Sequence, residues 1–209
     1  SSSLGCGQVL HCPYTADKAR IVVQEMIDGI SLELVEKRLV TDQLVLTVGY
    51  DIENLTRPEI RKVYKGPVTT DRYGRRVPKH AHGTWNLPRA TSSSSELLEA
   101  MAALYDKIVN PALLIRRMSL SACHVVNEKM AKEREQKETF EQLDLFTDYA
   151  KKEAKEKEEQ KKRERERRMQ EALLTIKKKY GKNAVLRGMN FEEGATAKER
   201  NGQIGGHQA

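Results

Sequence analysis

Apolar and polar positions repeat with two different periods along the first 126 residues, which predicts an alternation of strands and helices. Residues 7–12 form a short apolar stretch closed by Pro13, typical of a strand. From residue 19 to residue 34 apolar side chains recur at steps of three and four, the spacing of one helix face. Thr15 is a suitable N-cap for that helix. From Asp42 to Asp51 apolar residues alternate with smaller ones, which predicts a half-buried strand.

The same alternation continues after a basic stretch. Residues 83–87 are expected to form a third core strand, and residues 113–126 a long last one. Between them a helix is predicted from Glu96 to Val109, with Ser93 and Glu96 in the spacing of a capping box. The order βαββαβ predicts an α+β fold: a four-stranded antiparallel sheet with both helices on one face. The other face is expected to be open and polar, with Thr47, Gly49, Arg117, Ser119 and Ser121.

The remainder of the chain has a different composition. Lys, Glu and Arg dominate residues 127–182, and such a segment cannot bury enough apolar surface to build a core. We therefore expect one domain at 1–127, with a basic insertion at 52–80 that contains a hairpin, followed by a tail. The tail divides into a linker at 128–150, a charged helix at 151–182 and an irregular segment at 183–209.

The net charge of +7 and the pI near 9.2 favour a polyanionic partner. Between Ile52 and His80 there are eight Lys or Arg residues against three Asp or Glu. Lys and Arg side chains can contact phosphates by charge without a precise geometry. A solvated hairpin would explain the same basic residues equally well. The candidate contacts are Arg57, Arg61, Lys62, Lys65, Arg72, Arg75, Arg76 and Lys79, with Arg117 on the open sheet.

A second candidate feature is the pentapeptide Gln142–Phe146 in the charged tail. Between residues 131 and 168 the large apolar residues are few and cluster around it. An extended peptide of this kind can place Leu and Phe in neighbouring pockets of a partner. The alternative is an amphipathic helix, because Phe140, Leu143, Phe146 and Tyr149 recur every three residues.

The sequence gives little support for disulfides, a membrane span, a metal site or catalysis. The three cysteines have no disulfide-framework spacing, which fits a reducing cytoplasm, and no apolar run is long enough to span a membrane. Adjacent His11 and Cys12 would point to opposite faces of a strand, so we expect no metal site. No nucleophile elbow, phosphate loop or paired-carboxylate spacing indicates catalysis.

Several segments together resemble the little-finger domain and C-terminal tail of Y-family (UmuC/DinB-like) translesion DNA polymerases, particularly the UmuC-like, UV-damage repair branch of Gram-positive bacteria. Residues 41–50 (TDQLVLTVGY) are similar to the second strand of that domain, and Leu114–Met118 (LIRRM) to its last DNA-contacting strand. Asp71–Arg75 (DRYGR) with Val77–Ala81 (VPKHA) matches the insertion of that branch. Gln142–Phe146 (QLDLF) resembles the sliding-clamp-binding peptide of the family, and EEGAT, ERN and IGGH near the C-terminus resemble the end of the branch.

The resemblance implies a domain that grips template–primer duplex DNA during damage bypass in the SOS response, in the cytoplasm at the nucleoid. Its implied partners are duplex DNA and the bacterial sliding clamp, with no membrane. The implied DNA contacts are Arg116, Arg117, Ser119, Arg72, Arg75, Arg76, Lys79 and Arg89. The implied clamp contacts are Gln142, Leu143, Leu145 and Phe146.

One departure from the family is large. The palm, fingers and thumb, with the carboxylates that hold Mg²⁺ for two-metal nucleotidyl transfer, have no counterpart in this sequence. We therefore expect a fragment of a longer enzyme that is not catalytic on its own and needs no cofactor. Two alternatives stay open: an interaction module whose charged helix pairs with a partner as a coiled coil, and a nuclease.

Overall fold

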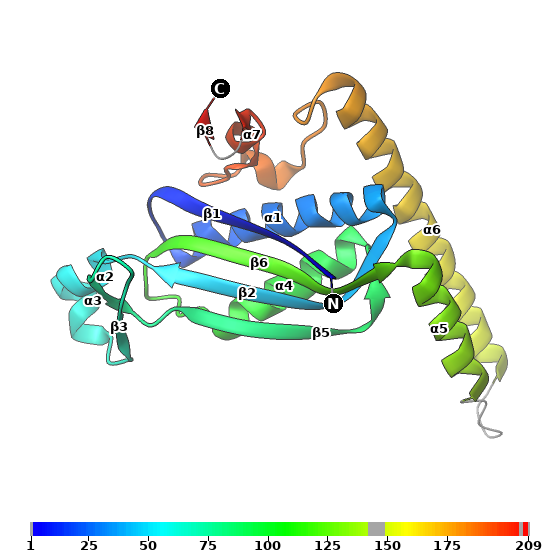
Figure 1. Cartoon of the computed structure of the whole chain (residues 1–209), viewed down its shortest axis with the longest axis horizontal. Helices are drawn as coiled ribbons and strands as arrows, with labels where there is room; N and C mark the ends of the chain where they lie inside the picture. Colours follow the sequence, from blue (N-terminus) through cyan, green and yellow to red (C-terminus); the bar gives the residue numbers. More distant parts are fainter. Residues whose placement is uncertain (1, 142–148, 205–206, 209) are drawn as a thin grey trace.

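Four long strands form one antiparallel sheet in the computed structural model, which describes residues 2–141, 149–204 and 207–208. The strands lie in the order β1-β6-β2-β5 (Figure 1). They are β1 (Ser2–Tyr14), β2 (Leu39–Tyr50), β5 (Ala81–Thr91) and β6 (Ile115–Asn127). The predicted mixed α+β class is confirmed. β1, β2 and β5 extend beyond the stretches predicted from alternation. In β2 the adjacent residues Val40 and Thr41 are both buried, next to a register shift, so the alternation is interrupted there.

Two long helices, α1 (Ala16–Lys37) and α4 (Ser94–Ile108), cover one face of this sheet (Figure 1). Thr15 caps α1 as predicted, its hydroxyl accepting from the Lys18 N–H at 3.5 Å. The core lies between the helices and the inward side chains of the two central strands. These buried residues include Val22, Ile27, Leu97 and Met101 from the helices, and Leu44, Leu46, Val48, Met118, Leu120 and Ala122 from the strands.

The capping box predicted for α4 forms only in part. Ser93 Oγ accepts from the Glu96 N–H at 3.3 Å, as expected. The Glu96 carboxylate, however, pairs with Arg89, and the Ser93 N–H donates to Thr91 Oγ1 at 3.0 Å. The correction has a simple cause: a nearby guanidinium is a stronger partner for a carboxylate than a backbone N–H.

The insertion after β2 contains more structure than a hairpin. It begins with two short helices, α2 (Glu53–Thr56) and α3 (Pro58–Val63), which the sequence analysis did not predict. Helices of four and six residues give too little periodicity to be recognised from pattern. The predicted hairpin follows, formed by β3 (Val68–Thr70) and β4 (Arg76–Pro78). In Figure 1 the insertion lies beyond one end of the sheet.

The charged tail forms two helices at the opposite end of the sheet. α5 (Glu128–Glu141) continues directly from β6, and α6 (Tyr149–Tyr180) runs beside it in Figure 1. The second half of α6 docks on the domain. Gln170 is buried and donates to Ser31 Oγ at 2.8 Å and to the Ser92 carbonyl at 3.0 Å. The largely helical tail is therefore confirmed, and its docking is a feature that sequence did not indicate.

The C-terminal segment returns to pack against α1. It contains a 3₁₀ helix, η1 (Gly188–Phe191), a short helix, α7 (Ala197–Arg200), and a small ladder of β7 (Gln203–Ile204) with β8 (His207–Gln208). The buried carboxylate of Glu25 accepts from the N–H groups of Thr196 at 2.8 Å and Ala197 at 3.1 Å. Gly194 makes the preceding turn at φ +93°, a conformation that other residues rarely adopt.

Candidate nucleic-acid interface

The sheet face opposite α1 and α4 has mostly small, uncharged side chains around Arg117, with the exposed Val9 of β1 beside it. Of all residues in the four strands, only Asp42 is acidic. The outward positions alternate with the buried ones, as predicted, and include Thr47, Ser119 and Ser121 on the central strands. His82 of β5 lies on the same face, with Nδ1 2.9 Å from Thr47 Oγ1. A phosphate group that approached Thr47 and Ser119 would meet hydroxyl groups there, and the one carboxylate of the strands, Asp42, is paired with His124.

Arg117 is the cation of this open face. It lies opposite Gly49 in the pairing of β6 with β2. A Cβ atom at position 49 would lie 2.6 Å from Arg117 Cγ and 2.8 Å from Nε, so the guanidinium arm crosses over the glycine. Arg117 is exposed, and no carboxylate among the described residues pairs with it. Its charge is therefore available to an external anion.

Arg116 is positioned by an irregularity in the same strand. Gly49 pairs with Arg117 but Tyr50 pairs with Ile115, so Arg116 is an extra residue in β6. Such a bulge re-aims a side chain. Arg116 Nη1 lies 3.9 Å from the buried carboxylate of Asp51, a loose pair that leaves the guanidinium partly exposed.

The insertion adds cations at the same end of the sheet. Two of its arginines are paired: Arg57 with Glu53 and Arg75 with Asp71. Five others are exposed, and their side chains make no ion pair or hydrogen bond with any described residue. They are Arg61, Lys62, Lys65, Arg76 and Lys79.

The hairpin tip, residues 71–75, is held by one carboxylate. Asp71 Oδ1 accepts from the N–H groups of Tyr73 and Arg75, each at 2.9 Å. Burial alone would raise the pKa of Asp71, but these backbone hydrogen bonds and the Arg75 guanidinium outweigh it, so the pKa is lowered. Gly74 closes the turn at φ +78°. The tip is therefore an ordered structure.

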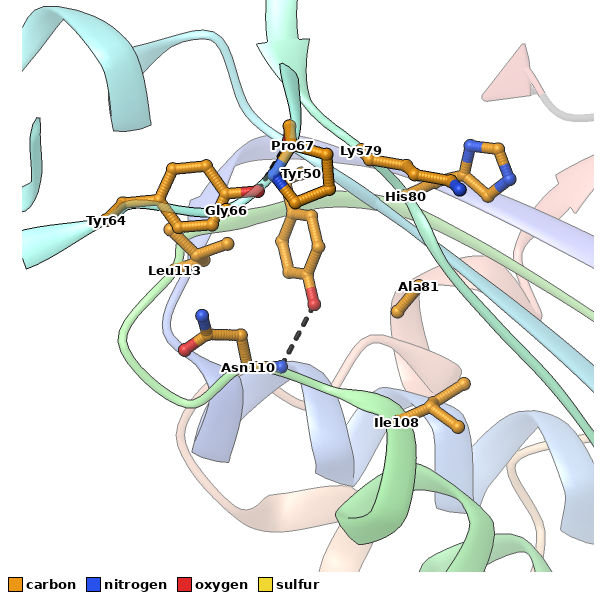
Figure 2. Close-up of a pocket in the computed structure, with 10 residues that line it drawn as sticks. All are labelled: Tyr50, Tyr64, Gly66, Pro67, Lys79, His80, Ala81, Ile108, Asn110 and Leu113. Atoms are coloured by element: carbon orange, nitrogen blue, oxygen red, sulfur yellow. Dashed lines mark hydrogen bonds between the residues drawn. The ribbon is translucent and has the colours of Figure 1, made fainter. Parts of the chain in front are cut away.

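A cavity of about 290 Å³ lies where the insertion meets the sheet, and Figure 2 shows the residues that line it. The Tyr50 hydroxyl accepts from the Asn110 N–H at 3.0 Å, and the Tyr64 hydroxyl donates to the Pro67 carbonyl at 2.6 Å. Burial raises the pKa of Tyr50 and of Tyr64, which keeps both phenols neutral. Among the described residues that line this cavity none is acidic, and Lys79 is its cation. The cavity belongs to the same basic end of the molecule.

The structure brings most of the predicted DNA contacts to one end. Arg116, Arg117, Arg72, Arg75, Arg76 and Lys79 all lie there, and Ser119 follows Arg117 on the open face (Figure 1). Arg89 does not join them, because its guanidinium pairs with Glu96 at the N-terminus of α4. The predicted clamp contacts, Gln142, Leu143, Leu145 and Phe146, lie outside the described residues.

The exposed ring of Tyr73 at the hairpin tip was missed as a site residue. It is 65% exposed, with the Arg72 and Arg75 guanidinium carbons 4.8 and 5.1 Å from the ring centroid. An aromatic residue between two arginines in a Gly-containing turn was a signal present in the sequence.

The two helices that cover the sheet have the opposite charge. α1 has five acidic and three basic residues, and α4 has three acidic and one basic. Within the domain, positive charge is therefore concentrated on the open sheet end and the insertion, while the docked helix α6 brings 13 basic and seven acidic residues to the helix side.

The described residues were also considered for a metal site and for a membrane-spanning helix. In the described ranges no three His, Cys, Asp or Glu side chains are grouped as a metal site would need. No helix within those ranges is both long and apolar enough to cross a bilayer.

No protein-family model matches the chain, and no curated protein is similar enough to count as a relative. Function is therefore proposed from the chain's own residues.

Proposed function

We propose that this chain is a non-catalytic DNA-holding module that grips duplex DNA through the open sheet face and the basic insertion. The observation that carries the proposal is the difference in charge between the elements of the domain: the strands and the insertion are net basic, and the two covering helices are net acidic. The four strands have one acidic residue, Asp42, and Arg117 forms no ion pair with any described residue. Contacts of this kind recognise phosphates and carry little sequence preference.

The test is a salt titration of duplex binding, followed by fluorescence anisotropy. A protein that neutralises several phosphates loses affinity steeply as salt rises, with a logarithmic slope of about −0.9 per phosphate. Arg117→Ala should weaken binding and reduce that slope by about 1. Lys107→Ala, which removes an exposed charge from α4 on the opposite side, is the matched control and should change neither quantity.

The proposal fails if binding is independent of salt, or if the intact chain does not bind duplex DNA at low salt. It also fails if Lys107→Ala weakens binding as much as Arg117→Ala. Affinity would then depend on the net charge of the protein and not on where the charge lies.

We further propose that the module is the little-finger part of a Y-family translesion polymerase acting in DNA repair. The strand and helix order and the insertion after β2 support this, together with the sequence resemblance. The chemistry would be supplied by domains that this sequence does not contain. A Mg²⁺-dependent nuclease or polymerase assay on the purified chain should give no activity, and turnover would contradict the proposal.

The bacterial sliding clamp is the proposed protein partner, through residues 142–146. The support is the sequence pattern, in a segment that separates α5 from α6. Replacing Leu145 and Phe146 with Ala should abolish clamp binding in surface plasmon resonance and leave DNA binding unchanged. Clamp binding that survives this change would favour the amphipathic-helix alternative.

A further inference from the structure

The geometry of the hairpin tip points to a second nucleic-acid contact: we propose that Tyr73, with Arg72 and Arg75, binds an unpaired nucleotide of single-stranded DNA. This deepens the proposed DNA-holding function and rests on it. It assigns a different ligand geometry to the tip of the insertion, beyond the end of the sheet.

The exposed ring is the first reason. Tyr73 is 65% exposed at the tip of an insertion that itself projects from the domain (Figure 1). Exposed aromatic rings on basic surfaces are the groups on which proteins stack single-stranded bases, and this stacking tolerates any base.

The arginines beside the ring are the second reason. Arg72 Nη2 donates to the Tyr73 hydroxyl at 2.6 Å, and its guanidinium carbon is 4.8 Å from the ring centroid. The Arg75 guanidinium is 5.1 Å from the same centroid, and its Nε donates to Asp71 Oδ2 at 2.9 Å. A nucleotide offers both a base for the ring and a phosphate for these cations, so one ligand satisfies the whole group.

The tip is also ordered before any ligand arrives. Asp71 fixes the backbone at two N–H groups and holds Arg75, so the ring and one guanidinium are already placed. A preformed contact loses less conformational entropy on binding than a mobile loop does.

Unpaired DNA fits this surface better than duplex. The faces of bases inside a duplex are covered by their neighbours, so a ring can stack only on a base outside the helix. Duplex DNA on the open sheet face would contact Arg117, which lies opposite Gly49, just before the chain enters the insertion. A strand that continues past the duplex at that end would meet the basic insertion.

The experiment compares two DNAs that share one duplex: a blunt form and a form with a single-stranded extension of about ten thymidines. Intact chain should bind the extended form more tightly. Tyr73→Ala should remove roughly 5- to 100-fold of affinity for the extended form, the range found when a stacking residue is truncated, and leave blunt-duplex binding unchanged. Tyr73→Phe should keep most of the gain. Tyr180→Ala removes an equally exposed aromatic beside Lys179 on α6 and should have no effect.

The outcomes separate the two proposals. If the intact chain binds blunt duplex but gains nothing from the extension, or if Tyr73→Ala keeps the gain, the hairpin-tip proposal is wrong and the DNA-holding function stands. If blunt duplex is not bound at all, the function itself fails. Thermal melts of each variant test whether loss of fold is the cause. Tyr73 is not among the described residues that form the core or pack on it, so Tyr73→Ala should leave the melting temperature unchanged.

Discussion

Glu25 should control whether the C-terminal segment stays on the domain. Its side chain is buried within α1, and three donors point at its carboxylate: the Thr196 N–H at 2.8 Å, the Ala197 N–H at 3.1 Å and Asn190 Nδ2 at 2.6 Å. Glu25→Gln keeps the volume but replaces one acceptor oxygen with an N–H₂ group that faces donors.

The size of the effect follows from these contacts. A hydrogen bond to a charged group contributes about 1.5–3 kcal/mol, and such contributions within one cluster are not additive. We expect Glu25→Gln to weaken docking of residues 188–202 by about 3 kcal/mol, which is about a 100-fold change in the local opening equilibrium. The sheet and α4 should stay folded, because the change frees a surface segment and leaves the main core intact.

Hydrogen–deuterium exchange measures this directly. Amides in residues 188–202 should lose protection by about 100-fold in Glu25→Gln, while amides in the centre of α1 keep theirs. Glu33→Gln is the control, since Glu33 on the same helix pairs with Lys37 at the surface. Unchanged protection of the C-terminal segment would refute the role assigned to Glu25.

Three further predictions concern stability and titration. Gly83→Ala should destabilise the fold by about 1–3 kcal/mol in urea denaturation, because its Cβ would lie 2.7 Å from Ile108 Cγ2, whereas Gly29→Ala in α1, with open space around it, should stabilise by about 0.5–1 kcal/mol. Burial raises the pKa of Cys6 from 9.0 to about 11, so at pH 8 its alkylation, followed by mass spectrometry, should be roughly 100-fold slower than that of an unburied thiol. The lowered pKa of Asp71 means that its support of the hairpin tip is fully present above the ordinary carboxyl pKa and is lost as pH falls through the lowered value. NMR shifts of tip amides should therefore titrate below about pH 4, and a midpoint above the ordinary value would contradict the hydrogen-bonded tip.

The sheet and its two helices could be predicted because each element buries one face. Burial of one face requires apolar residues at a regular spacing in the sequence. The buried residues Leu44, Leu46 and Val48 follow the two-residue spacing of a strand. Val22 and Met26 follow the four-residue spacing of a helix face. The open face could be predicted from the same alternation, since whatever is not buried on a strand faces the other way.

The docking of the tail could not be predicted from pattern. It depends on polar contacts between residues far apart in sequence, such as Gln170 with Ser31 and Arg187 with Asp28. These contacts depend on the folded geometry and produce no regular spacing of residues in the sequence. The same reason explains Arg89. The resemblance implied a DNA contact, but the turn into α4 brings the Glu96 carboxylate to its guanidinium.

The arrangement of the sheet separates the two surfaces that the proposed function needs. β6 begins at Ile115 beside Arg116 and Arg117, and ends at Asn127, where α5 starts. Its 13 residues, at about 3.3 Å each, place roughly 40 Å between the basic end and the helices of the tail. Both central strands are rigidly paired along this length, so the distance is fixed. A partner bound near the tail helices would therefore neither cover Arg117 nor neutralise the insertion, since charges so far apart are screened at physiological salt. Grip on DNA and attachment to a protein partner are thus expected to be separable, and variants at one end should combine additively with variants at the other.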